Sequence, residues 1–111
     1  MLKVLVCIND GLLKLRINRL LSEKNYQFTI TDKPIKRADL FQFDVVIIHS
    51  TYRITDLYNF IEHAVLQELT TIMYITTNVN SNPFRKLNDH SNLVFIYENK
   101  LDIELHLALT R

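Results

Sequence analysis

Polar side chains follow four apolar runs of the sequence, and together they could bind an anion or support phosphoryl chemistry. Asn9 and Asp10 follow the first run, His49 follows "VVII", Thr76 follows "IMYI", and Lys100 lies just past the last run. An ammonium and a hydroxyl can hold a phosphate-like group, and an imidazole can act as base, ligand or structural donor. If the runs are neighbouring parallel strands, these five residues meet at one edge of a sheet.

Three roles are open to His49. It could be phosphorylated, as in a phosphohistidine relay; it could bind a transition metal together with Asp10; or it could be a structural histidine bonded to Thr76, Lys100 or the backbone. The structural role is favoured, because no second ligand or activating base stands at a supporting spacing. No metal-binding spacing joins the remaining candidates, which are Cys7, His63, His90 and His106. We therefore expect no metal site and no cofactor.

Apolar strands that alternate with helical patterns must position these residues. The apolar runs predict five strands, at residues 2–8, 26–31, 45–49, 70–77 and 92–98. Apolar residues at helical spacing predict helices in residues 11–24, 51–68 and 101–109, whereas the connections at 32–42 and 78–91 have room for short helices only. The alternation predicts an α/β fold with a doubly wound, five-stranded parallel sheet in the order 2-1-3-4-5 and shortened second and fourth helices.

Composition narrows the class of protein. The 111 residues predict one domain, 1–111, and the 48% hydrophobic residues, 23% charged residues and net charge of +1 are ordinary for a globular protein. These values indicate no membrane partner and no direct binding of nucleic acid. The single cysteine favours a cytoplasmic location. One glycine leaves no P-loop or dinucleotide fingerprint, and no nucleophile–base pair is visible, so we do not expect an enzyme.

The pattern resembles a CheY-like receiver domain, the input module of two-component response regulators, over about residues 2–105. The segments "KVLVCIND", "DVVIIH", "IMYITT" and "YENKLDIEL" carry the resemblance. It implies that the phospho-accepting aspartate of receivers falls on His49, their Ser/Thr on Thr76 and their lysine on Lys100. The acidic pair of receivers falls on Ile8 and Asn9, with Asp10 one step beyond.

The departures from the receiver pattern predict that phosphorylation is lost. Receiver chemistry needs a carboxylate nucleophile and a Mg²⁺ ion held largely by acidic oxygens. Ile8 offers no oxygen, Asn9 offers one neutral carbonyl, and His49 offers a nitrogen that Mg²⁺ disfavours. Lys100 then needs another partner, and we expect an ion pair with Asp10 across the crevice.

The sequence therefore predicts a non-phosphorylatable pseudo-receiver that acts as a regulatory interaction module in bacterial signalling or transcription regulation. One alternative is a sensor that binds a small anion or nucleotide-like ligand in the sheet-edge crevice. A second alternative is the input domain of an ANTAR-type, RNA-binding antiterminator whose output helices are not in this chain. In that case we expect residues 1–111 to be the front portion of a longer regulator, ending inside or at the end of the last receiver helix; otherwise they form a stand-alone domain.

The closing helix suggests how such a module meets a partner. Its apolar residues alternate strictly, at Leu101, Ile103, Leu105, Leu107 and Leu109. Alternate positions of a helix lie about 200° apart around its axis, so one core cannot receive all five side chains. We expect some of them to form an interface with a protein partner or with a second copy of the chain, centred on Leu105 or Leu107.

Overall fold

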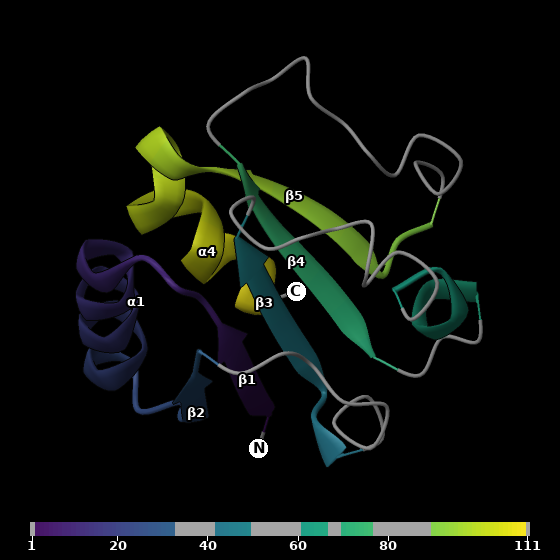
Figure 1. The fold of residues 1–111 in the computed structure, drawn as a ribbon, viewed down its shortest axis with the longest axis horizontal. Helices are drawn as coiled ribbons and strands as arrows, with labels where there is room; N and C mark the ends of the chain where they lie inside the picture. The colour runs from purple at the N-terminus through teal and green to yellow at the C-terminus, as the bar shows by residue number, and fades with distance from the viewer. Residues whose placement is uncertain (1, 33–41, 50–60, 67–69, 77–89, 111) are drawn as a thin grey trace.

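Five strands and two long helices make up most of the described chain, which comprises residues 2–32, 42–49, 61–66, 70–76 and 90–110 of a computed structural model (Figure 1). In chain order they are β1 (Lys3–Cys7), α1 (Gly11–Glu23), β2 (Gln27–Thr31), β3 (Val45–His49), β4 (Thr71–Thr76), β5 (Leu93–Tyr97), the 3₁₀ turn η2 (Glu98–Lys100) and α4 (Leu101–Leu109). Residues 61–66 are also helical. The predicted strands and first and last helices are confirmed to within two residues. The predicted short helices between β2 and β3 and between β4 and β5 lie largely outside the described residues.

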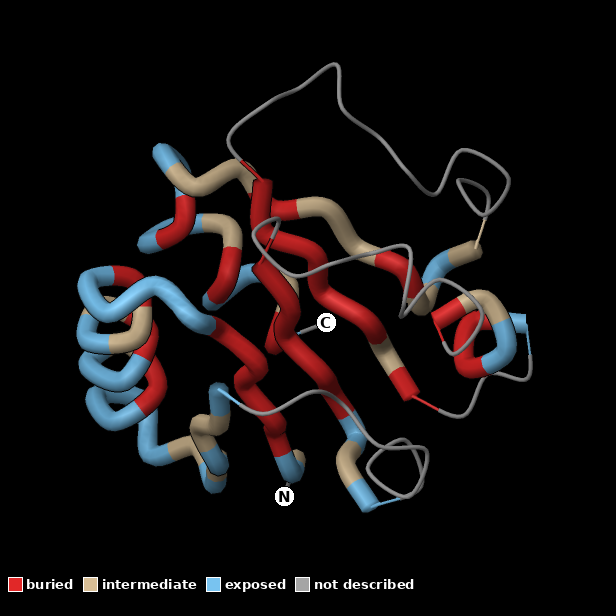
Figure 2. Tube along the Cα trace, viewed as in Figure 1, coloured by how far each residue is buried: buried red, intermediate tan, exposed pale blue. Residues whose placement is uncertain are grey.

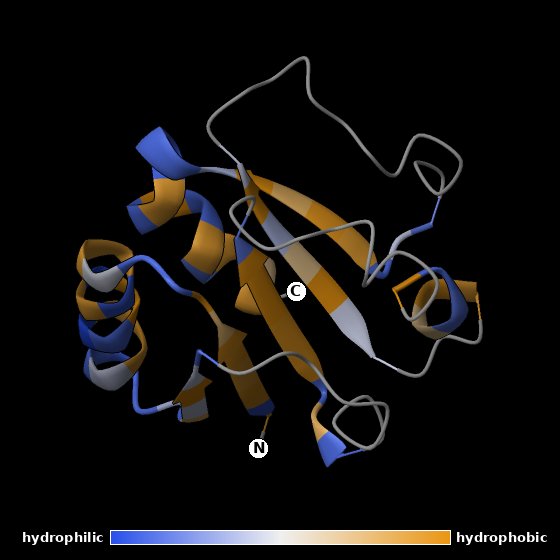
Figure 3. Ribbon diagram, viewed as in Figure 1, coloured by the Kyte–Doolittle hydropathy of each residue, from blue (hydrophilic) through white to orange (hydrophobic). Residues whose placement is uncertain are grey.

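The strands form one parallel sheet in the predicted order β2-β1-β3-β4-β5. The three inner strands are buried along almost their whole length and are strongly apolar, whereas the edge strand β2 is only half-buried (Figures 2 and 3). A strand covered on both faces needs apolar side chains in both directions, which explains the continuous apolar runs of the sequence.

Two hydrophobic layers cover the two faces of the sheet. Helices α1 and α4 pack together on one face, where alternate strand residues such as Val6 and Ile47 meet Ile17 of α1 and Leu105 of α4. The helical residues 61–66 pack on the opposite face against the intervening strand residues. Helices on both faces of a parallel sheet define the doubly wound α/β class, as predicted. Within the described residues, no helix is long and apolar enough to cross a membrane.

Local signals fix both ends of α1. The carboxylate of Asp10 accepts a hydrogen bond from the Leu13 N–H at 3.0 Å, which caps the first turn. At the other end Asn25 adopts a left-handed conformation with φ of 58°, and Tyr26 N–H donates to the Leu21 carbonyl while Asn25 N–H donates to the Ser22 carbonyl. These two bonds are those of a Schellman motif, in which asparagine replaces the usual glycine.

Helix α4 divides its five apolar residues between the core and the solvent. Leu101, Leu105 and Leu109 are buried, whereas Ile103 and Leu107 are 68% and 57% exposed. The expectation that one core cannot hold all five is confirmed. The choice of Leu105 as an interface centre is wrong, because its side chain packs in the layer between α4 and the sheet and is only 1% exposed.

Candidate functional site

The carboxyl ends of the inner strands bring four predicted site residues to one edge of the sheet. We call this region the carboxyl edge and define it by Asn9, Asp10, His49, Thr76 and Glu98. Asn9 and Asp10 follow β1 and are exposed, while His49 and Thr76 are the last residues of β3 and β4 and are buried. Because parallel strands end at the same edge, the topology alone produces this gathering.

The sheet register separates the side chains of His49 and Thr76. His49 pairs with Ile75, one residue before Thr76, and Ile75 belongs to the layer beneath α1 and α4. Side chains alternate along a strand, so Thr76 falls on the opposite face, together with Tyr74. The two residues are neighbours at the carboxyl edge, but each belongs to a different layer.

His49 faces an acidic residue that the sequence reading did not single out. Its Nε2 atom lies 3.8 Å from Oε1 of Glu98, and the side chains are 5% and 26% exposed. Glu98 directly follows β5, whereas the lysine of receivers occupies this part of the fold. The signal was present in the sequence, since Glu98 is the first charged residue after the last apolar run.

Lys100 does not form the ion pair that we expected it to form with Asp10. The residue ends the 3₁₀ turn η2 and is exposed. Among the described residues, Arg16 and Asp102 form an ion pair and His49 lies 3.8 Å from Glu98, whereas the predicted pair between Asp10 and Lys100 does not form. The carboxylate of Asp10 instead caps α1. The prediction failed because the cap of α1 engages the carboxylate of Asp10, and Lys100, the last residue of η2, is exposed.

Hydrogen bonds hold the segment after β5 against both helices. The Arg16 side chain donates to the Glu98 carbonyl at 3.2 Å and to the Asp102 carboxylate at 3.0 Å. The carboxylate of Glu104 accepts a hydrogen bond from the Tyr97 N–H at 3.2 Å. These contacts fix the backbone that carries Glu98, and with it the acidic side chain that faces His49.

The donor set of the carboxyl edge does not fit the Mg²⁺ ion that receivers use. Ile8 stands at the position of the first acidic residue of receivers. It is fully buried and has no oxygen on its side chain. Asp10 uses one carboxylate oxygen to cap α1, and His49 presents a nitrogen to a cation that prefers oxygen. In the described part of the chain, no three His, Cys, Asp or Glu side chains group in a way that could hold a metal ion.

Comparisons with known proteins identify the fold. No protein-family model matches the chain, and no curated protein matches its sequence. Among solved structures, it is similar to a pilus assembly-related protein from Burkholderia pseudomallei, with a TM-score of 0.73 and 21% identity over 99% of this chain and 90% of that chain. It is also similar to the chemotaxis protein CheY4 from Vibrio cholerae, with a TM-score of 0.72 and 18% identity over 100% and 98% of the two chains.

Proposed function

The chain has a CheY-like receiver fold, and we propose that it is a receiver-type signalling module that cannot be phosphorylated and acts by docking to another protein. The observation that carries the proposal is the pair His49–Glu98. Receivers place a carboxylate at the end of β3, whereas this chain places an imidazole there, and the first residue after β5, Glu98, sets a second carboxylate beside it, two residues before the exposed Lys100.

The pair His49–Glu98 does not suit a phosphoryl group. An imidazole at the end of β3 does not supply the carboxylate that forms an acyl phosphate, and Glu98 repels a phosphoryl group that a lysine would attract. The buried Ile8 adds no ligand for the metal ion that neutralises phosphate charge. A module built in this way keeps the scaffold of a receiver and works through its surface.

The outer face of α4 is the surface best suited to a partner. Ile103 and Leu107 are one helical turn apart and exposed. Leu107 also lines a groove of about 270 Å³ between α4 and the edge strand β5, together with Phe95 and Tyr97. Exposed apolar side chains beside a groove favour protein contact, and a second copy of the chain is the simplest partner for such a face.

Beryllofluoride, a mimic of the phosphoryl group, tests the lost chemistry. Titration of the labelled chain with beryllofluoride and Mg²⁺, followed by ¹H–¹⁵N NMR, should leave the amide resonances near His49 and Thr76 unchanged. A receiver with an intact acidic site serves as the positive control. Saturable shifts centred on the carboxyl edge would refute the proposal that the site is inert.

Sedimentation velocity tests the docking surface. We predict a homodimer or weaker self-association at a protein concentration on the order of 50 μM, which Leu107→Glu should abolish by placing a charge in the apolar contact. Leu12→Glu is the matched control, because Leu12 is an 82% exposed leucine on α1. Monomers at this concentration, or equal loss of association in both variants, would contradict self-association through α4.

A further inference from the structure

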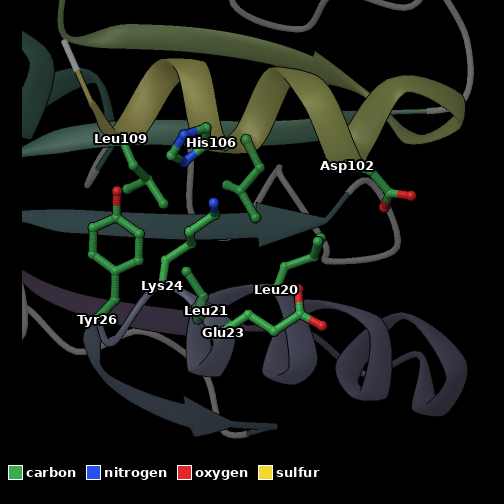
Figure 4. A pocket seen from close by; sticks show the side chains of 9 residues that line it. Leu20, Leu21, Glu23, Lys24, Tyr26, Asp102, His106 and Leu109 are labelled. Carbon is green, nitrogen blue, oxygen red and sulfur yellow. The ribbon is translucent and has the colours of Figure 1, made fainter.

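A groove between α1 and α4 lies away from the carboxyl edge and has an apolar floor. Leu20 and Leu21 contribute to it from α1, and Leu105 and Leu109 from α4 (Figure 4). Its volume is about 200 Å³. The groove is thus large enough for a short aliphatic chain and smaller than a site for a drug-sized ligand.

Three side-chain donors stand around one end of this groove. Lys24 extends from the end of α1 toward His106 on α4, and the hydroxyl of Tyr26 points toward Leu109 (Figure 4). Among the hydrogen bonds and ion pairs of the described residues, none involves the side chain of Lys24, Tyr26 or His106. The donors can therefore be used by a ligand without breaking a contact of the fold.

The local backbone explains why two of the donors share the groove. Lys24 is the C-cap of α1, and Tyr26 follows the left-handed Asn25 of the Schellman motif. The motif turns the chain sharply after α1, and Tyr26 lines the groove beside Leu21, whose carbonyl accepts its N–H. A defined turn thus places Lys24 and Tyr26 on the same rim.

The acidic residues of the rim lie toward the other end. Glu23 and Asp102 are separated from Tyr26 along the groove in the view of Figure 4. Asp102 is already paired with Arg16, whose Nε lies 3.0 Å from its carboxylate. The charge of that end is therefore partly neutralised inside the protein, while the charge of Lys24 has no partner among the described residues.

We propose that the groove between α1 and α4 binds a small carboxylate with a short apolar body. The apolar part packs against Leu20 and the ring of Tyr26, which are partly exposed, above Leu21, Leu105 and Leu109, which are buried in the core. The carboxylate accepts hydrogen bonds from Lys24 and Tyr26, with His106 beside it. Charge complementarity favours an anion over a cation at this end, because a ligand ammonium would face Lys24. The floor favours an aliphatic anion over inorganic phosphate, which has no surface to bury there. The proposal is independent of the proposed docking function.

Three probes of equal chain length test it by ¹H–¹⁵N NMR: hexanoate, hexan-1-ol and hexylamine. Hexanoate should shift the amides of residues 21–26 and 105–109, with a dissociation constant on the order of 1 mM. Hexan-1-ol should bind more weakly, and hexylamine more weakly still. The absence of saturable shifts with hexanoate up to about 10 mM would overturn the proposal. Binding of hexan-1-ol or hexylamine as tight as that of hexanoate would also overturn it.

Two substitutions locate the anion. Lys24→Gln removes the charge and keeps a polar side chain that is one atom shorter, and it should weaken hexanoate binding about threefold, as expected for an exposed ion pair. Lys14→Gln makes the same change on the same helix outside the groove and should leave binding unchanged. Equal affinities of the wild type and Lys24→Gln would contradict the placement of the carboxylate at Lys24.

Discussion

The carboxyl edge of the sheet and the groove between α1 and α4 differ in whether their polar side chains have partners within the protein. At the carboxyl edge, Asp10 caps α1 and His49 faces Glu98 at 3.8 Å. In the groove, Lys24 and Tyr26 stand at the rim of an apolar floor, and their side chains have no hydrogen-bond partner among the described residues.

The difference shows that a protein can present polar groups to a ligand at a place other than the usual ligand site of its fold. Ligands of doubly wound sheets usually bind outside the carboxyl ends of the strands, because polar loops and helix ends meet there. In this chain Ile8 is buried at that place and Glu98 faces the imidazole of His49. The groove between α1 and α4 also offers polar groups to a ligand, at a place where the fold by itself predicts none.

The largest effect is expected from His49→Asp, which restores the residue type of a receiver at the end of β3. The new carboxylate would be buried next to Glu98, and two like charges without a cation should cost about 3 kcal/mol of unfolding free energy. Urea denaturation measures the loss. His49→Asn introduces a side chain of nearly the same size as Asp but without a charge, so it should lower the unfolding free energy by less.

A double-mutant cycle sharpens this prediction. If repulsion from Glu98 causes the loss, Glu98→Gln should recover part of the stability of His49→Asp and should not stabilise His49→Asn in the same way. If the wild type and His49→Asp were equally stable, Glu98 would not disfavour a second carboxylate at position 49. The contrast between the carboxyl edge and the groove would then fail.

A smaller effect is expected from Asp10→Ala. The substitution removes the cap of α1 and should lower the unfolding free energy by about 1 kcal/mol. Asp10→Asn retains an acceptor oxygen and should remain close to the wild type. If Asp10→Ala were as stable as the wild type, the carboxylate would not be engaged in the fold and would be available to a ligand.

The smallest effect on stability is expected from Lys24→Gln. Because no described contact of the fold uses the ammonium, the unfolding free energy should change by less than about 0.5 kcal/mol. Thermal and urea denaturation of the variant and the wild type provide the measurement. A loss as large as that of Asp10→Ala would show that Lys24 has a structural role, and the two regions would no longer differ.

The sheet was predictable because its strands are encoded locally. The apolar runs ending at Cys7 and His49 are too continuous for exposed strands, and their alternation with helical patterns leaves few topologies. The start of α1 was also predictable, since Asp10 precedes an apolar repeat at helical spacing and does cap the helix.

The details of the site were less accessible from the sequence. The receiver resemblance of "YENKLDIEL" drew attention to Lys100, and Glu98, the first residue of the turn η2, was overlooked. In α4, the stripe of Leu101, Leu105 and Leu109 and the stripe of Ile103 and Leu107 have the same four-residue spacing. Packing against the sheet decides which stripe is buried, and the sequence pattern alone does not contain that information.

Incubation with acetyl phosphate and Mg²⁺, followed by intact-mass spectrometry, tests the central claim most directly. The claim is that a receiver fold carries a site unable to accept a phosphoryl group, because His49 stands at the end of β3, where receivers have a carboxylate, and its imidazole faces the carboxylate of Glu98. We predict that the mass of the chain remains unchanged while a receiver with an intact acidic site gains a phosphoryl group under the same conditions. A stoichiometric gain of one phosphoryl group on this chain, located on His49 by fragmentation, would contradict the account.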